Sequence, residues 1–369
     1  MMVIIVVILM LIVAGVLERR LHESRLGRIP VRIHINGTRG KSTLTRLITS
    51  LLSKSGLRVA AKVTGEHPEY FSPDSDWTPW KRRSPPRIKE QLRFIKAASK
   101  NGAQAVVIEN MSLAPENQYV SEKILVKSTM SLLSNVRIDH REVMGKNLQE
   151  IAVTLSCAFP QEGEFVMNDS SSHLFDRAVL PRRTTICNVE KTFGNPIDRM
   201  SMPILEYLKS KFNIEDSVFD SIARSDNHSK EIDDLIMQKK DRRYVNLFSC
   251  NDVMSADEII EYLTENGRIC EAYDILLMCR RDRPLRTIDF VDWALKKKQF
   301  ENLIIAGHFP LLPVKKRCRG IPHVQMIRGV NPKAIMTRLT QIQCSTVLCI
   351  GNYVGTGEKI IEYLQGDAS

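Results

Sequence analysis

A glycine-rich stretch near the amino terminus, residues 35–43 with the sequence INGTRGKST, constrains the fold more than any other part of the chain. It follows the apolar residues 31–35, which predict a strand, and it precedes Lys41–Lys54, whose periodicity predicts a helix. Glycines between a strand and a helix let backbone N–H groups approach phosphate oxygens, and the helix adds the positive end of its dipole. The stretch therefore predicts an α/β domain with a phosphate-binding loop.

The spacing differs from the common pattern G-x-x-x-x-G-K-[ST], which would place its first glycine at Ile35 rather than at Gly37. Lys41 would neutralise the β- and γ-phosphates of ATP, and the Ser42 hydroxyl would hold Mg²⁺. We expect ATP to contact Gly37, Thr38, Gly40, Lys41, Ser42 and Thr43. The alternative is a tight glycine turn that the serine and threonine cap.

Acidic, amide and imidazole side chains follow two later apolar runs. Glu109 ends the run AVVIE, and Asn135, Asp139 and His140 follow the run at residues 129–134. Because ligands of open α/β sheets bind beyond the carboxyl ends of the strands, we expect Glu109 to meet a metal ion. Neutral His140 could bind a second Mg²⁺ or orient a water molecule. The alternatives are a surface carboxylate or helix cap and a structural histidine.

Short apolar runs alternate with amphipathic stretches along the chain, which is typical of a mostly parallel sheet wrapped by helices. Besides the runs already named, strands are expected at residues 164–167, 245–249, 274–279, 302–306 and 346–350, and helices at residues 255–266 and 332–341. Residues 64–87, rich in Pro, Ser, Trp and charge, predict a long surface loop.

The strand pattern is lost over residues 196–243, and this stretch predicts a domain boundary. We expect an ATP-binding domain at residues 28–238 and a smaller Rossmann-like α/β domain at residues 244–369.

Residues 1–17 contain no charged or polar side chain, and ERRLHESRLGR follows them at once. This length is at the short end of what spans a bilayer as a helix, so residues 1–22 predict a transmembrane anchor. A cleaved signal peptide is the alternative, but the positive residues follow the apolar run and no A-x-A-like site appears. Arg19, Arg20, Arg25 and Arg28 would keep the carboxyl-terminal body in the cytoplasm, on a single-pass protein of the cell membrane.

The 369-residue chain carries a net charge of +11 with a pI near 9.3, which indicates an anionic partner. Nucleic acid is disfavoured because no recognition fold or aromatic interleaving is visible. The eight cysteines form no C-x-x-C pair, so we expect reduced thiols, mostly in the core, rather than zinc ligands or disulfides.

Together these segments resemble the Mur ligase family of ATP-dependent amide-forming enzymes, whose loop is G-T-x-G-K-[ST]-[ST] and whose later strands end in Glu and in N-x-x-x-D-H. The chain is more similar still to the ligase subunit of poly-γ-glutamate synthase, the CapB/PgsB family. That resemblance covers nearly the whole chain and is carried by the anchor and by VRIHINGTRGKSTLTRL, AVVIENMSLAPENQ, NVRIDHREVMG, VNLFSCNDVMSAD, LLMCRRDRPLRT and LCIGNYVG.

The resemblance implies ATP and Mg²⁺ as cofactors and assigns roles to particular residues. Lys41, Glu109 and His140 would be catalytic, and Ser42, Glu109 and His140 would bind the metal. Asn135 and Asp252 would lie near ATP. Substrate carboxylates would be bound by Arg280, Arg281 and Arg283 of the segment CRRDR and by Asn352 of the later segment GNYVG.

The chain departs from the family in two places. Glu142 stands where the family usually has Asp, and the segment that supplies an ATP-contacting arginine cannot be located. Arg224, Arg242 and Arg243 are the candidates for that arginine.

The implied activity is polymerisation of glutamate through γ-linkages, by way of an acyl phosphate and with release of ADP. The partners would be glutamate, the growing polymer, small membrane subunits of a synthesis and export complex, and the bilayer. Four basic runs could attract the polyanion, or could be solvated faces: residues 81–83, 239–240, 296–298 and 315–317. The alternatives are a P-loop kinase, another Mur-like or folate-type ligase, and a membrane-tethered P-loop ATPase that binds a polyanion.

Overall fold

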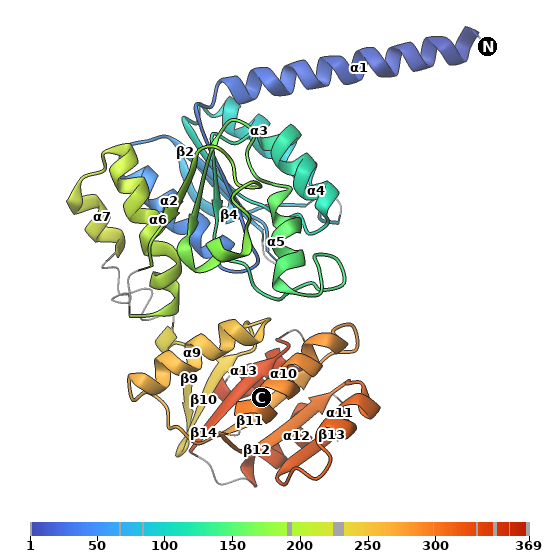
Figure 1. Cartoon of the computed structure of the whole chain (residues 1–369), viewed down its shortest axis with the longest axis vertical. Helices are drawn as coiled ribbons and strands as arrows, with labels where there is room; N and C mark the ends of the chain where they lie inside the picture. The colour runs from blue at the N-terminus through green and yellow to red at the C-terminus, as the bar shows by residue number, and fades with distance from the viewer. Residues whose placement is uncertain are drawn as a thin grey trace. The chain divides into compact units, whose positions relative to one another are not determined.

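The computed structural model describes residues 2–65, 68–82, 85–189, 194–223, 232–297, 299–329, 331–341, 345–353 and 355–366 (Figure 1). They form two compact units. Unit 1 comprises Met1–Phe193 and Ile197–Ser225, and unit 2 comprises Gly194–Pro196 and Asp226–Ser369.

Unit 1 is built on an eight-stranded sheet with the order β4-β3-β2-β5-β1-β6-β7-β8. The central strands are parallel, and only β3 and β4 at one edge run antiparallel to their neighbours. The strand bounds are β1 Val31–Asn36, β2 Val59–Val63, β3 Glu69–Ser72, β4 Ser75–Pro79, β5 Ala105–Glu109, β6 Met130–Leu133, β7 Glu164–Asn168 and β8 Thr184–Cys187. The predicted mostly parallel α/β sheet is confirmed.

Helices pack on both faces of this sheet, which is why β2 and β5 are buried along their whole length. One core joins β1 and β5 to α2 and α6, while another joins the opposite face to α3. The helices of unit 1 are α1 Met2–Gly27, α2 Lys41–Lys54, α3 Glu90–Lys100, α4 Pro115–Val120, α5 Leu148–Ser156, α6 Pro196–Phe212 and α7 Asp216–Ala223, with a π-helix at Ser121–Val126 and a 3₁₀-helix at Asp169–Leu174.

The predicted surface loop at residues 64–87 is wrong over its central part, which forms the β3–β4 hairpin at the sheet edge. Aromatic side chains stabilise this hairpin, because Phe71 packs on Trp77 with ring centroids 5.5 Å apart and Tyr70 packs edge-on against Phe94 at 5.8 Å. The prolines and charges of the segment hid this aromatic pattern. Residues 66–67 and 83–84 lie outside the described part of the chain.

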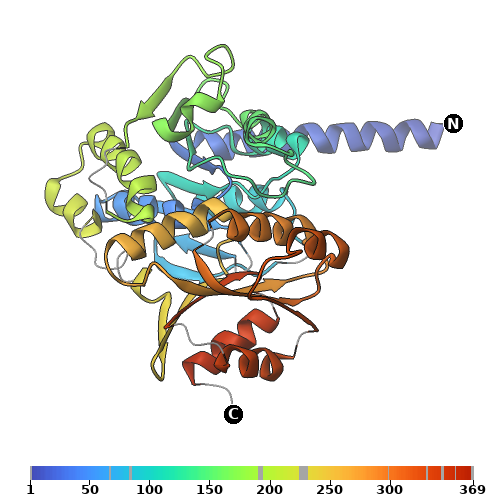
Figure 2. The ribbon, with the colours of Figure 1, turned by 60° about the horizontal axis from the view of Figure 1, so that its bottom comes forward.

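Helix α1 projects away from the rest of unit 1 (Figures 1 and 2), and the side chains of residues 2–20 are exposed. Among the described residues it is the one helix long and apolar enough to cross a membrane. It continues beyond the predicted residue 22 to Gly27, and its last turn enters the core through Leu26. The apolar segment is therefore continuous with the folded body of unit 1.

Unit 2 contains a six-stranded sheet with the order β13-β12-β11-β14-β10-β9 and helices on both faces (Figure 2). Only β9 is antiparallel to its neighbour. The strands are β9 Ile236–Lys239, β10 Arg242–Leu247, β11 Tyr273–Cys279, β12 Phe300–Gly307, β13 Val324–Arg328 and β14 Thr346–Gly351, and the helices are α9 Val253–Glu265, α10 Pro284–Lys297, α11 Leu311–Arg317, α12 Pro332–Thr340 and α13 Thr356–Gln365. The sequence missed β9 and β13 here, and β2 and β8 in unit 1.

The described cysteines are all free, and five of the seven are buried, whereas Cys157 is half-buried and Cys270 is exposed. Cys344 lies outside the described residues.

In the basic runs, several cations are bound within their own unit: Arg82 pairs with Glu90, Lys297 with Asp257 and Arg317 with Asp292, while Lys239 lies over the Tyr363 ring. Arg83 and Lys298 are not among the described residues.

Candidate active site

The glycine loop connects β1 to α2, as predicted, and two of its residues require glycine. Gly37 has φ 124° and Gly40 has φ 72°, which is backbone that side chains disfavour. A Cβ at Gly37 would overlap the Ser134 hydroxyl and lie 2.9 Å from the carbonyl oxygen of Asn135. The loop thus fits tightly against the residues that follow β6.

Asn135 holds the loop in this conformation. Its Oδ1 accepts hydrogen bonds from Thr38 Oγ1 at 2.9 Å and from the Arg39 N–H at 3.0 Å. Its carbonyl oxygen accepts from the Thr38 N–H at 3.1 Å, and Thr38 Oγ1 in turn accepts from the Arg137 N–H at 2.7 Å. Asn135 therefore fixes the conformation of the glycine loop, and its position near ATP stays a prediction.

Lys41 lies across the inside of the loop. Its Nζ donates to the carbonyl oxygens of Gly37, at 2.7 Å, and Thr38, at 3.3 Å. Burial lowers the pKa of this ammonium group, and the Glu109 carboxylate opposes that shift. An incoming phosphate would provide the counter-charge that the neutral carbonyl groups do not.

Ser42 and Glu109 lie together, as the sequence predicts. Ser42 Oγ donates to Glu109 Oε2 at 2.9 Å, and the Thr64 N–H donates to the same oxygen at 2.8 Å. The Glu109 side chain is buried at the end of β5. Within the described parts of the chain, no three His, Cys, Asp or Glu side chains form a metal site. A hydroxyl and one carboxylate nevertheless fit Mg²⁺, which keeps several waters and takes further oxygens from nucleotide phosphates.

His140 lies in a separate cluster beside the loop. Asp139 is buried and accepts from Arg39 Nη2 at 2.6 Å, and His140 Nε2 lies 3.6 Å from the same Asp139 oxygen. His140 Nδ1 is 3.8 Å from Glu142 Oε1. The structure thus gives Arg39 a partner and brings Ser42 to Glu109, while metal binding by His140 stays a prediction.

Met200 on α6 is a neighbour of the loop that no sequence signal indicated. Asn135 Nδ2 donates to its sulfur at 3.8 Å, and a Cβ on Gly40 would overlap that sulfur. Asn168 at the end of β7 fixes the Met200 carbonyl oxygen at 2.8 Å. The φ angle of Gly40 favours glycine, whereas the Met200 thioether is the end of a flexible side chain that can move aside for a Cβ.

In unit 2, Asp252 caps the amino terminus of α9. Its Oδ1 accepts from the Ser255 N–H at 2.8 Å, and its Oδ2 accepts from the Ser255 hydroxyl at 2.7 Å. Capping is thus its observed role, and contact with ATP stays a prediction.

Two of the candidates for the ATP-contacting arginine bind carbonyl oxygens inside unit 2. Arg242 donates to the carbonyl oxygen of Leu339, and Arg243 donates to that of Arg268. Arg224 lies outside the described residues.

Two neighbouring cavities of about 390 and 430 Å³ lie at the carboxyl ends of the unit 2 strands, and both are lined by Arg280, Arg281 and His308. Asn352 lines the first cavity, whereas Arg283 lies outside the lining of both. Arg280 is held by Asp282 through two bonds of 2.9 and 2.8 Å. Three of the four predicted substrate-binding residues therefore meet at one edge of the sheet.

Arg286 on α10 is a further residue that the sequence did not single out. Its Nη1 donates to Asn251 Oδ1 at 2.6 Å and to Asn352 Oδ1 at 3.2 Å. Asn352 Nδ2 donates to the Met278 carbonyl oxygen at 3.1 Å. Arg286 thereby links the loop before α9 to the loop after β14.

Comparison with solved structures shows the fold. The folylpolyglutamate synthase/dihydrofolate synthase of Yersinia pestis, solved with AMPPNP and a manganese ion, matches with a TM-score of 0.63 and 10% identity, over 94% of this chain and 92% of that one. MurF from Acinetobacter baumannii matches with a TM-score of 0.65 and 9% identity, over 94% and 78%. The Mur ligase-like architecture predicted from the sequence is confirmed.

Comparison with sequences finds similarity to CapB proteins. Residues 232–367 match the model of the poly-gamma-glutamate synthase CapB C-terminal domain. The capsule biosynthesis protein CapB of Bacillus anthracis is 28% identical, over 96% of this chain and 80% of its own length. The PGA synthase CapB of Bacillus subtilis (strain 168) is 29% identical, over 95% and 94%. The chain is therefore similar to CapB proteins over nearly its whole length, and its residues 232–367 match the CapB C-terminal domain.

Proposed function

We propose that this chain polymerises glutamate through γ-amide bonds, with activation of a carboxylate by ATP and release of ADP and phosphate. The observation that carries the proposal is the glycine loop with Lys41 inside it and the Ser42–Glu109 pair at its end. One relative is named a PGA synthase, which supports glutamate as the substrate.

The chemistry follows from the weak reactivity of a carboxylate towards an amine at neutral pH. A carboxylate oxygen of the substrate attacks the γ-phosphorus of ATP, and the bond to the ADP oxygen breaks. The amine of the next glutamate then attacks the carbonyl carbon of the acyl phosphate, phosphate leaves with the bonding pair, and the nitrogen loses a proton. The loop N–H groups and Lys41 would stabilise the negative charge on the transferred phosphoryl group.

A divalent cation would neutralise charge on the phosphates, and we assign Mg²⁺ to this role. Ser42 and Glu109 would hold it, since their oxygens already lie 2.9 Å apart. His140 would join this site or orient a water molecule, beside the Asp139 carboxylate that also binds Arg39.

The cavities of unit 2 would bind substrate carboxylates. Guanidinium groups match carboxylates in a two-pronged geometry, and Arg280 and Arg281 line both cavities. Lys359 adds a third basic side chain to the first cavity, and Asn352 adds an amide.

We further propose that α1 anchors the chain in the cell membrane, with both units in the cytoplasm, and that small membrane subunits for synthesis and export are its partners. Support comes from the exposed apolar surface of residues 2–17 and from the arginines that follow it.

The test supplies membranes containing the full chain and its partner subunits with ATP, Mg²⁺ and labelled glutamate. We expect labelled polymer and ADP, and we expect Lys41→Ala to abolish both. Lys54→Ala, at the exposed far end of the same helix, is the matched control and should leave the rate unchanged. Formation of AMP would refute the acyl-phosphate route, and polymer synthesis by Lys41→Ala would refute the site.

The same assay distinguishes a folate-type ligase, an alternative that the fold similarity to folylpolyglutamate synthase keeps open. A folate-type enzyme would add labelled glutamate to a reduced folate and would form no long polymer without it. The proposal predicts polymer without any folate.

A further inference from the structure

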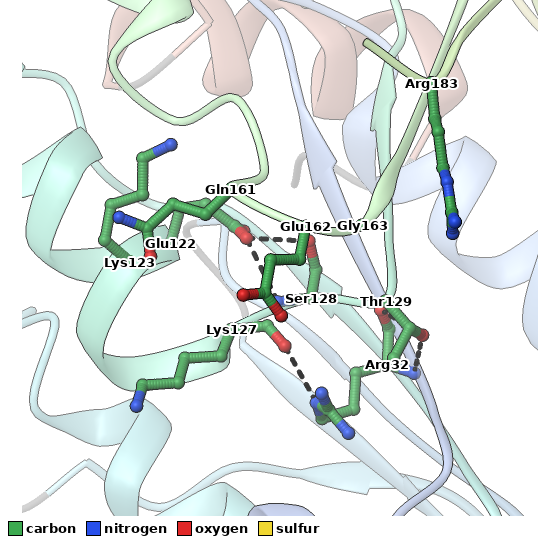
Figure 3. Close-up of a pocket in the computed structure, with 10 residues that line it drawn as sticks. All are labelled: Arg32, Glu122, Lys123, Lys127, Ser128, Thr129, Gln161, Glu162, Gly163 and Arg183. Carbon is green, nitrogen blue, oxygen red and sulfur yellow. Dashed lines mark hydrogen bonds between the residues drawn. The ribbon is translucent and has the colours of Figure 1, made fainter. Parts of the chain in front are cut away.

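A separate cavity of about 460 Å³ lies in unit 1 at the amino-terminal ends of the parallel strands, opposite the edge that carries the phosphate loop. Arg32 is the second residue of β1, and Thr129, Gly163 and Arg183 directly precede β6, β7 and β8. The remaining lining residues are Glu122, Lys123, Lys127, Ser128, Gln161 and Glu162 (Figure 3). None of the residues that line this cavity is apolar, so the cavity suits a hydrophilic, charged group.

Basic side chains outnumber acidic ones in this lining, four to two. The Arg32 guanidinium donates to the carbonyl oxygens of Lys127 at 2.9 Å and Ile29 at 2.8 Å. Neutral carbonyl groups orient this guanidinium, and the nearby Glu122 carboxylate offsets part of its charge. Arg183 is exposed and lies on the opposite side of the cavity from Lys123 (Figure 3).

The two acidic groups differ in their surroundings. Glu122 is buried, and its carboxylate is bound by His34 Nδ1 at 2.7 Å and by the N–H and hydroxyl of Ser128 at 3.0 and 2.7 Å. Glu162 is exposed and belongs to the cavity wall. The lining therefore keeps an excess of basic side chains, of which Lys127 is paired with Glu23 outside the lining, and Glu162 is its exposed acidic group.

The carboxyl end of α1 is fixed to the wall of this cavity. Lys127 Nζ pairs with Glu23 Oε1 at 2.9 Å, His22 Nε2 lies 2.8 Å from the Leu125 carbonyl oxygen, and Arg32 Nη1 donates to the Leu26 carbonyl oxygen at 3.3 Å. Leu26 is also buried in the core. The end of the apolar helix is therefore joined to the cavity wall by direct contacts.

The length of α1 places the cavity relative to a bilayer. The apolar residues 2–17 would lie in the hydrocarbon core, which is about 30 Å thick. The charged residues from Glu18 onward and the last turns of α1 would then lie on the inner side, at the headgroup layer. The basic cavity beside its last turn lies at the depth where lipid phosphates are found.

We propose that this cavity binds the phosphate-bearing headgroup of an anionic phospholipid, from the leaflet through which α1 leaves the membrane. The proposal rests on the membrane anchoring proposed above. A lipid is favoured over the polymer because the cavity is attached to α1 and lies at the opposite sheet edge from the phosphate loop.

The test titrates the purified full chain, in an uncharged detergent, with short-chain phosphatidylglycerol and phosphatidylcholine, and counts bound lipid by native mass spectrometry. We expect saturable binding of phosphatidylglycerol alone. Arg183→Ala should weaken it about fivefold, and Glu162→Gln should strengthen it by a similar factor. Arg182→Ala, an exposed neighbour outside the cavity lining, is the matched control and should change nothing.

Equal binding of the two lipids, or equal affinity in the Arg183→Ala and Glu162→Gln variants, would overturn the proposal. Displacement of the lipid by equimolar glycerol phosphate would assign the cavity to a free anion, and displacement by oligo-γ-glutamate would assign it to the polymer. Liposome flotation of the full chain tests the anchor separately. A chain that floats but does not distinguish the lipids refutes the cavity alone, whereas a chain that does not float refutes the anchoring.

Discussion

Asn135→Ala is the substitution that most directly tests how the phosphate loop is held. It removes the Oδ1 atom that accepts from Thr38 Oγ1 at 2.9 Å and from the Arg39 N–H at 3.0 Å. It leaves the backbone bond from the Thr38 N–H to the Asn135 carbonyl oxygen in place. The loop therefore loses its side-chain support but keeps its connection to the chain that follows β6.

The magnitude follows from the two lost hydrogen bonds, at about 1 kcal/mol each. The glycines of the loop give it alternative conformations, so ATP binding would have to restore the ordered one. A total of about 2 kcal/mol corresponds to a rise of about 30-fold in the Kd for ATP.

The measurement is the affinity of the full chain for a fluorescent ATP analogue, with thermal unfolding to show that the variant remains folded. Asn117→Ala, at an exposed position on α4, is the control and should bind ATP as the parent chain does. A Thr38→Val partner completes a double-mutant cycle, and we expect a coupling energy of about 1 kcal/mol because the two side chains share one hydrogen bond.

The reasoning is refuted if Asn135→Ala binds ATP within twofold of the parent chain. Strict additivity of Asn135→Ala and Thr38→Val would also contradict it, because the two residues would then act independently.

Two further substitutions test the loop and the sheet. Gly37→Ala should weaken ATP binding by more than about tenfold because the added Cβ has no room. Gly56→Ala is the control, since Gly56 also has a positive φ but nothing lies within 4 Å of its added Cβ, and this variant should bind ATP normally. Equal effects of the two substitutions on ATP binding would show that backbone strain alone is responsible. Burial raises the pKa of Glu90, but the hydrogen bond and charge of Lys62 outweigh burial and hold that pKa below 4.5 in the folded chain. The stabilisation of the folded chain by ionised Glu90 is therefore present above pH 4.5 and is lost as the pH falls through the lower, folded-state pKa. Glu90→Gln should therefore be less stable at pH 7 and lose less stability on acidification in denaturant titrations, unlike the exposed Glu116→Gln; parallel acid profiles of Glu90→Gln and the parent chain would contradict this.

The parts of the site that lie within one strand and its following loop could be predicted from the sequence. The loop between β1 and α2 has its glycines, lysine and serine within seven residues, and the structure places α2 at the predicted residues. The Ser42–Glu109 pair could also be expected, because parallel strands bring their carboxyl ends to one edge.

The contacts that depend on side-chain packing between distant segments could not be predicted. Met200 reaches the loop from α6, and Arg286 joins two loops of unit 2, yet neither residue belongs to a local pattern. The β3–β4 hairpin was missed because its stabilising contacts are aromatic pairs, one of which is made with α3. The basic cavity was missed because residues from four strand beginnings form it, each of which resembles an ordinary surface residue in the sequence.

The register of β1 determines which measurement would detect a misaligned strand in this protein. Ile35 lies opposite Glu109 on one side and Asn36 lies opposite Leu133 on the other, so these two residues of β1 align both halves of the proposed nucleotide site. A slip of one residue between β1 and β5 would shift Glu109 by about 3.3 Å and turn it to the other face of the sheet. Nucleotide affinity at the proposed site would then be lost while most of the secondary structure remained, so ATP binding would report strand alignment more sensitively than circular dichroism would.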